Sequence, residues 1–353
     1  MLRNYMFAVL CFLASTFLPA LPGYQFEFPR DHGTHDEYRT EWWYYTGHVQ
    51  TESGKRYGFE LTFFRVGVEP PDVPQRTNWD LRNLALAHFA ITDVGDKKFR
   101  YYQKLNRMSP FTAGAAAGRL DVFNEAWSAT TTRDGAWRIT ASQNGDAIDL
   151  VLRARKQPAI HGENGVSVKA QGVGYASHYY SMTRLVASGT VNGERCTGLA
   201  WMDHEFGSSA LRENQRGWDW FSVQLDNDTE LMLYQIRTTS GAPDVTSSGS
   251  LVTSNGDVIH LAHDQFVVRP LSKWTSPRSR AVYPLGWSIA IPSLKIRVRI
   301  DPLLDDQELV TRGSTRVTYW EGACRVSGSL ENVSVSGDAY VEMTGYDRAF
   351  KAP

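Results

Sequence analysis

Short runs of alternating apolar and polar residues make up most of the chain. Lys295 to Ile300 (KIRVRI) alternates with a strict period of two, and Ile148 to Arg155 nearly does. This pattern is typical of strands with one face in a core and the other in water. Residues 208–214 could form two helical turns, but no long amphipathic helix is expected. We predict an all-β fold of mostly antiparallel strands.

Turn signals separate these runs. Asp134-Gly135 and four Asn-Gly pairs, which begin at positions 144, 164, 192 and 255, lie between apolar segments. Asn-Gly is the strongest short-range signal for a β-hairpin, because both turn residues take positive φ in a type I′ turn. Hairpins are therefore expected at these positions.

One strand-pair motif occurs twice. Glu41 to Val49 (EWWYYTGHV) precedes an apolar run that ends at Arg65, and Gly217 to Leu225 (GWDWFSVQL) precedes one that ends at Arg237. In each copy a Trp is followed by two aromatic residues and a small hydroxyl residue. Similarity between such widely separated segments predicts a duplicated β-domain.

The length agrees with two domains, since single hydrophobic cores stop growing near roughly 250 to 300 residues and the chain has 353. We predict a signal segment over residues 1–23, an N-terminal barrel over 24–205, a connector over 206–216 and a C-terminal barrel over 217–353. A barrel of about eight strands has an interior that suits packed side chains or one small ligand. Aromatic residues make up 12% of the chain, which is compatible with either use.

The net charge and the N-terminal segment limit the possible classes of partner and the location of the protein. The net charge is -1 and no basic run occurs, so nucleic acid and anionic membrane surfaces are not expected as partners. Arg3, the apolar run Met6 to Phe17, and Leu18-Pro19-Ala20 are typical of a secretory signal. The run is shorter than the roughly 20 residues of a spanning helix. We expect an exported, periplasmic or extracellular protein with no membrane span after signal cleavage.

Three cysteines are present. Cys11 lies inside the predicted signal, which leaves Cys196 and Cys324. An exported protein could join these two in a disulfide, but both lie in strand-like segments and their distance does not follow from the sequence. The sequence leaves undecided whether these two cysteines form a disulfide.

The densest polar cluster is the segment WMDHEFGS, residues 201–208. On a strand, Asp203 and Glu205 would face one way and His204 the other. Carboxyls that are buried beside aromatic residues have raised pKa values and can stay protonated as general acids. Ion pairing with arginines across the domain boundary is the structural alternative.

A second cluster, DHGTHDE, precedes the first repeat. His32 and His35 with flanking acids could bind a divalent metal, but their spacing matches no closed zinc motif and no CxxC is present. His48 and His88 are lone histidines on predicted strands, where a core position is more common than a ligand role. No GxSxG or glycine-rich phosphate loop occurs. We therefore expect no cofactor.

Six motifs span nearly the whole mature chain in order: FPRDHGTHDEYRTEWWYYTGH (28–48), HYYSMTRL (178–185), WMDHEFGS (201–208), GWDWFSVQL (217–225), YPLGW (283–287) and YWEGACRVSG (319–328). Together they resemble the AttH/CrtC-like family. The resemblance implies two lipocalin-like antiparallel β-barrels packed together, in agreement with the duplicated motif.

The family resemblance implies more than one activity. The family includes carotenoid 1,2-hydratases, which add water to an isolated terminal alkene of an acyclic carotenoid, and distant members resemble fungal pericyclases. It also includes many exported bacterial proteins, to which this chain is more similar because of its signal segment and its DHEFGS motif. The catalytic residues of the hydratases do not match position by position, so none is carried over.

If the reaction is hydration, its chemistry names candidate residues. Asp203 or Glu205 would protonate the alkene, and His204 would orient or deprotonate the attacking water. Aromatic faces would stabilise the carbocation. The candidate ligand-binding residues are Trp42, Tyr44, His88, Trp201, Trp218 and Trp220.

Three hypotheses on function remain. The first is a cofactor-free hydro-lyase, similar to carotenoid 1,2-hydratase, that acts on an apolar, isoprenoid-like molecule between or within the barrels. The second is a non-catalytic carrier of hydrophobic ligands, in which Asp203, His204 and Glu205 only join the domains. The third is a metal-assisted secreted hydrolase that uses His32 and His35.

Overall fold

The computed structural model describes residues 16–77 and 80–351. Most of the predicted signal segment therefore lies outside the described residues. Within them the chain forms two large antiparallel β-sheets and no α-helix, which confirms the all-β prediction. The only helical pieces in this part of the chain are two short 3-10 turns, Arg30–His32 and Pro292–Leu294. No helix there is long and apolar enough to cross a membrane.

The first sheet follows the order β4-β3-β2-β1-β13-β12-β9-β8-β7-β6-β5, and two further short strands, β10 and β11, pair with β12. Its strands are β1 (Thr40–Thr51), β2 (Arg56–Gly67), β3 (Asn83–Asp93), β4 (Lys98–Arg107), β5 (Ala113–Ala115), β6 (Asp121–Asn124), β7 (Trp127–Thr131), β8 (Trp137–Gln143), β9 (Asp146–Ala154), β10 (Ala159–Ile160), β11 (Ser167–Val168), β12 (Ala176–Val191) and β13 (Glu194–Gly207).

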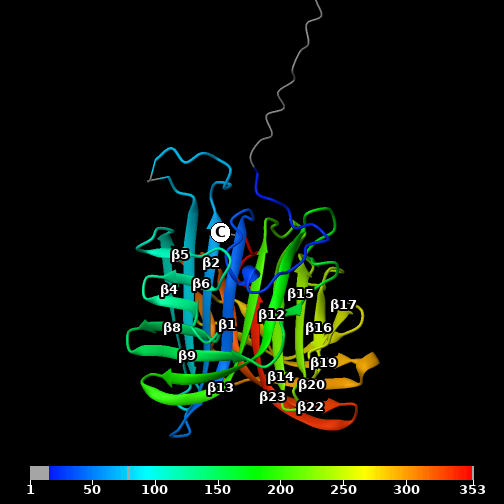
Figure 1. The fold of residues 1–353 in the computed structure, drawn as a ribbon. Coiled ribbons are helices and arrows are strands. Elements are labelled where there is room, and N and C mark those ends of the chain that lie inside the picture. The colour runs from blue at the N-terminus through cyan, green and yellow to red at the C-terminus, as the bar shows by residue number, and fades with distance from the viewer. Residues whose placement is uncertain (1–15, 78–79, 352–353) are drawn as a thin grey trace, which may run out of the picture.

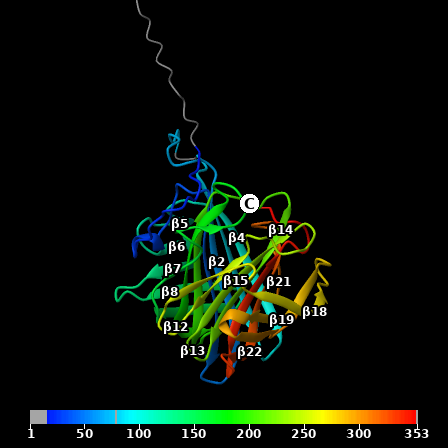
Figure 2. The same cartoon turned by 90° about the vertical axis from the view of Figure 1, so that its right-hand side faces the viewer.

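The second sheet follows the order β17-β16-β15-β14-β23-β22-β20-β19-β18, with β21 paired to β22. Its strands are β14 (Gln215–Leu225), β15 (Glu230–Thr238), β16 (Ser248–Val252), β17 (Val258–Ala262), β18 (Val267–Thr275), β19 (Val282–Ile291), β20 (Ile296–Pro302), β21 (Glu308–Val310), β22 (Thr318–Leu330) and β23 (Val333–Thr344). The two sheets curl into barrels that lie side by side (Figures 1 and 2).

The repeated motif forms equivalent hairpins in the two sheets. Trp42 on β1 faces Phe64 on β2, and Trp218 on β14 faces Ile236 on β15. The connection between the sheets runs over residues 208–214, because β13 continues to Gly207 and β14 begins at Gln215. This connection contains turns and bends, so the two helical turns allowed by its sequence do not form.

The Asn-Gly turns agree with the expected chemistry at three positions. Asn144, Asn164 and Asn192 all have positive φ, as do the glycines that follow them. The turn at Asn144 joins β8 to β9, and the turn at Asn192 joins β12 to β13. At the fourth pair only Gly256 has positive φ, so the expected type I′ geometry is wrong there.

Each sheet encloses its own aromatic core. Trp43 and Tyr45 point into the first core, together with Phe59 and Trp127. Alternation along β1 therefore sends Trp42 and Tyr44 to the outer face of the sheet. A third apolar cluster forms where the outer faces meet, and it contains Tyr44, Tyr179, Trp201, Trp220, Met232, Tyr234, Ile236, Ala323 and Tyr340.

The two cysteines lie in different cores. Cys196 belongs to the first core and Cys324 to the second. Both are free thiols in the described structure, so the disulfide left open by the sequence is not formed.

Hydrogen bonds and ion pairs tie the sheets together across the third cluster. His48 Nε2 lies 3.0 Å from the Ala339 carbonyl oxygen. Glu230, on β15, accepts from Arg184 of the first sheet at 2.5 Å and from Lys156 at 2.6 Å. The Glu230 carboxylate is fully buried, and the two cations are less than a tenth exposed. The first and second sheets therefore share a buried charge cluster.

Replacing Glu230 with Gln should destabilise the protein strongly. The change removes the carboxylate from buried Lys156 and leaves Arg184 with the exposed Asp228, and breaking a buried ion pair costs about 3 to 5 kcal/mol. Urea unfolding of the variant and the parent protein measures the difference. The matched control is Glu194→Gln, which removes an exposed ion pair with Lys55 and should leave the unfolding midpoint unchanged. Equal effects of the two variants would contradict the prediction.

Candidate active site

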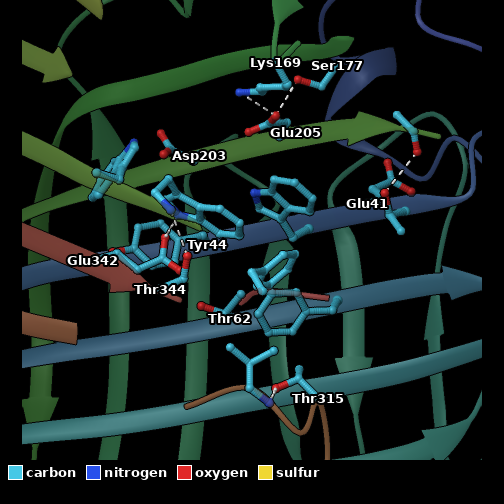
Figure 3. A pocket seen from close by; sticks show the side chains of 18 of the residues that line it. Glu41, Tyr44, Thr62, Lys169, Ser177, Asp203, Glu205, Thr315, Glu342 and Thr344 are labelled. Atoms are coloured by element: carbon cyan, nitrogen blue, oxygen red, sulfur yellow. Dashed lines mark hydrogen bonds and ion pairs between the residues drawn. The ribbon is translucent and has the colours of Figure 1, made fainter. Parts of the chain in front are cut away.

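A cavity of about 200 Å³ lies between the two sheets. Its lining comes from the outer faces of both sheets and from the connection 208–214, so residues far apart in the sequence meet there (Figure 3). The apolar part of the lining includes Trp42, Phe64, Val66, Leu211, Trp218, Trp220, Ile236, Val317 and Phe350. The polar part includes Tyr44, Thr62, His88, Lys169, Ser177, Tyr179, Asp203, Glu205, Tyr234, Tyr319, Glu321 and Glu342.

Asp203 lies on the cavity-facing side of β13. Tyr179 donates its O–H to Oδ2 at 2.6 Å, and Oδ1 accepts from Trp201 Nε1 at 2.5 Å and from the Ser181 hydroxyl. Burial raises the pKa of Asp203 to about 7, and these three donors limit the rise. No arginine or lysine pairs with Asp203 among the residues that the structure describes. The group can therefore exchange a proton near neutral pH.

Glu205 points to the same side, as the predicted alternation requires (Figure 3). Lys169 Nζ lies 2.9 Å from its carboxylate, and the Ser177 hydroxyl donates to it. The ammonium group also lies 4.3 Å from the centre of the Tyr234 ring. Although burial lowers the pKa of Lys169, Glu205 reverses this effect and the pKa is raised overall. Lys169 is therefore a cation, which makes Glu205 an ion-pair partner.

Two further carboxyls line the cavity from the second sheet. Tyr44 donates its O–H to Glu321 Oε1 at 2.6 Å, and Trp218 Nε1 donates to Glu342 Oε2 at 3.1 Å. Burial, followed by the neighbouring acids, holds the pKa of Glu321 well above its usual value. Burial raises the pKa of Glu342 to about 7. The cavity thus contains one carboxyl, Glu321, that keeps its proton at neutral pH, and another, Glu342, that exchanges its proton there.

His88 is a fully buried lining residue with both ring nitrogens occupied. Nδ1 lies 2.7 Å from the Tyr319 hydroxyl, and Nε2 lies 2.8 Å from the Ser314 hydroxyl. Burial lowers its pKa to about 3, so the ring is neutral. These contacts join β3 to the second sheet, which gives His88 a structural part in the cavity wall.

The predicted aromatic residues divide into two groups. Trp42, Tyr44, Trp218 and Trp220 line the cavity directly. Trp201 lies behind Asp203, to which its indole N–H donates, and its ring packs edge to face on Trp220. The carboxylates and the aromatic faces proposed from the sequence are thus brought together.

His204 does not lie with them. Its ring stacks on Trp43, with 4.8 Å between the ring centres, on the side of β13 that faces the first core. Nε2 lies 2.9 Å from Glu41 Oε1, and Nδ1 lies 3.0 Å from the Asp31 carbonyl oxygen. The sequence hypothesis that His204 orients or deprotonates water therefore finds no support in its position.

The histidine-rich N-terminal segment was a candidate metal site. Among the described residues, His35, Glu41 and His204 form one group whose possible ligand atoms lie within 4.8 Å of one another. Glu41 Oε1 lies 2.8 Å from His35 Nδ1, and Oε2 accepts from Arg65 Nε at 3.0 Å. Both oxygens are thus occupied, and the guanidinium would repel a cation. These residues do not fit a metal ion, and His32 instead hydrogen-bonds Tyr180 at 2.7 Å.

Sequence reasoning missed Lys169, Tyr179, Glu321 and Glu342. Each of the two glutamates is a lone acid between apolar or aromatic neighbours on a strand, as in YWEG and YVEM. That pattern is the available signal. It was missed because an acid on the outer face of a barrel normally points into water.

Comparison with known proteins supports the family resemblance. The AttH-like family profile matches residues 19–346. The crystal structure of an AttH-type protein from Nitrosomonas europaea is 33% identical and superposes with a TM-score of 0.83, covering 93% of this chain and 99% of the other. Kievitone hydratase from Nectria haematococca superposes with a TM-score of 0.70 at 15% identity, covering 94% of this chain and 96% of that enzyme.

A sequence relative extends the comparison to fungi. Dehydratase asqC of Emericella nidulans is 20% identical over 285 residues, which cover 72% of this chain and 75% of the relative. At 15% identity, the superposition on kievitone hydratase shows a shared fold and nothing more. The match over nearly the whole chain shows more: this protein belongs to the AttH-like family.

Proposed function

We propose that this protein is a hydro-lyase that adds water to, or removes water from, an apolar small molecule bound in the cavity between the sheets. The observation that carries the proposal is Asp203. Its carboxyl lines an aromatic cavity and has a pKa raised by burial to about 7. A general acid needs a pKa near the working pH.

The proposed reaction uses the groups in the cavity wall. In hydration, Asp203 forms the new C–H bond by giving its proton to one alkene carbon, and positive charge develops on the neighbouring carbon. Trp42 and Trp220 line the same cavity, and an aromatic face contributes about 0.5 to 2 kcal/mol to the stability of a cation. Water then forms the C–O bond, and the proton that it loses restores the Asp203 carboxyl. Dehydration reverses these steps.

Cavity size limits the substrate. A cavity volume of about 200 Å³ is only somewhat larger than that of a cavity that holds benzene, about 150 Å³. A long isoprenoid chain would therefore place only one end in the cavity. Terminal double bonds or terminal tertiary alcohols of acyclic isoprenoid-like molecules fit this constraint.

The names of relatives support the same class of reaction. Kievitone hydratase and dehydratase asqC are named for the gain and the loss of water. The two other hypotheses explain the site less well. A carrier of hydrophobic ligands needs the aromatic lining but not Asp203, Glu321 and Glu342. A metal-assisted hydrolase needs His32 and His35, which instead hydrogen-bond Tyr180 and Glu41. Export remains part of the proposal, on the strength of the signal-like sequence alone.

Replacing Asp203 with Asn should reduce turnover at least about 100-fold, since general acid catalysis contributes roughly 10² to 10⁴. The assay incubates the protein with a panel of acyclic isoprenoid alkenes and their tertiary alcohols and follows gain or loss of one water by mass spectrometry. The control variant is Asp338→Asn, outside the cavity in an ion pair with Arg56, and it should retain activity. Native mass spectrometry that finds a bound, unchanged isoprenoid in a protein without turnover would favour the carrier hypothesis instead.

The pH dependence of kcat/KM should reflect the ionisation of Asp203. Because the protonated form of Asp203 is the active one and its pKa lies at about 7, kcat/KM should be level below that pH and fall up to tenfold per pH unit above it. Glu342 also has a pKa of about 7, so Glu342→Gln is the control and should keep the falling limb. A limb that disappears in this variant, or a rate that rises with pH, would contradict the assignment to Asp203.

A further inference from the structure

Four buried side chains between the sheets carry polar atoms that lack a hydrogen-bond partner within the described part of the chain. They are Thr46 on β1, Glu60 on β2, Glu321 on β22 and Tyr340 on β23. The unpaired atoms are Thr46 Oγ1, Glu60 Oε2, Glu321 Oε2 and the Tyr340 hydroxyl. Buried polar groups are rarely left unpaired, because each then bears the full cost of leaving water.

The strand registers bring these groups to one end of the cavity. Thr46 and Glu60 are direct partners on neighbouring strands. Tyr44, two residues before Thr46 and on the same face, donates to Glu321 Oε1 at 2.6 Å. The first sheet therefore reaches Glu321 at the level of the Thr46–Glu60 pair.

Gly58 fixes the position of Tyr340. A Cβ atom at Gly58 would lie 2.5 Å from Ala323 Cβ and 3.4 Å from the Tyr340 hydroxyl oxygen. The absence of a side chain at Gly58 thus permits β2 to approach Ala323 and Tyr340 of the second sheet. Glu60 lies on the same strand between this contact and Thr62, which lines the cavity. The four groups therefore lie next to the part of the cavity wall that Thr62 and Glu321 form.

The electrostatics at this end favour a neutral polar ligand. Burial raises the pKa of Glu60 to about 8, against the hydrogen bond from Thr62. Burial and the nearby Glu342 and Glu60 raise the pKa of Glu321. Two neutral carboxyls and two hydroxyls offer both donors and acceptors without a net charge. Water suits such a set, since a buried water makes about three hydrogen bonds to otherwise unpaired groups.

We propose that Thr46, Glu60, Glu321 and Tyr340 bind the water molecule that the reaction adds or releases. Of the four, only Glu321 lines the cavity, so the water reaches the bound ligand beside the Glu321 carboxyl. Thr46, Glu60 and Tyr340 are positioning residues that hold and orient the water. The inference rests on the proposed hydro-lyase function, but the binding of water at these groups is testable without any substrate.

Thermal unfolding tests the water site directly. Thr46→Val and Tyr340→Phe remove one polar atom each with almost no change of shape. If these atoms bind water, both variants should lower Tm by roughly 2 °C or more, because they leave the water or a carboxyl unpaired. The matched control is Tyr45→Phe, whose hydroxyl is also unpaired but lies in the first core. Removal of this hydroxyl should leave Tm unchanged or raise it, and the same result for Thr46→Val and Tyr340→Phe would overturn the proposal.

A crystal structure and one catalytic variant complete the test. We expect an ordered oxygen within about 2.7 to 3.2 Å of Glu60 Oε2 and Glu321 Oε2. If the electron density shows no ordered oxygen there, the water site is wrong. Glu60→Gln should lower kcat at least tenfold with KM little changed, because Glu60 positions water without lining the cavity. If Asp203→Asn is inactive while Glu60→Gln has full kcat, the water site is wrong and the hydro-lyase stands. If no turnover is found but the Tm and electron-density results are as expected, the water site stands and the hydro-lyase function is wrong.

Discussion

Contact between the outer faces of the two sheets sets the chemistry of the cavity. In a single barrel the outer faces of β1, β2, β13, β22 and β23 would meet water, and their carboxyls would ionise in the ordinary way. Packed together, these faces exclude solvent, which penalises the charged form of an acid. Asp203, Glu60 and Glu342 have raised pKa values for this reason first.

Partners then distinguish one acid from another. Glu205 meets Lys169, and Glu41 meets Arg65 and two histidines. Burial alone would raise the pKa of Glu41, but Arg65 and the two rings outweigh it and leave this pKa well below its usual value. Among the described residues, Asp203 accepts hydrogen bonds from neutral donors alone, and Tyr44 is the one donor to Glu321. Ion-paired acids and acids with raised pKa values thus lie in one buried region, a separation that acid catalysis requires.

The duplicated hairpin explains how the sheets meet. Each copy ends in an arginine that pairs with a buried acid, Glu41 for Arg65 and Asp219 for Arg237. In each copy the outward Trp then lies at the shared boundary, and both Trp42 and Trp218 line the cavity. The two halves are not equivalent in detail, since only the first copy recruits the N-terminal segment through His35.

The sequence by itself determined the all-β architecture, the duplication, the family and the faces of β13, because period-two alternation and turn chemistry are local. It predicted that Asp203 and Glu205 share a face, and it named as ligand-binding residues Trp42, Tyr44, Trp218 and Trp220, which line the cavity. Only the tertiary structure decided which outer faces are buried. It therefore added Lys169, Glu321 and Glu342 to the site and showed that the face of His204 lies in the first core, since burial depends on contacts between strands far apart in the chain.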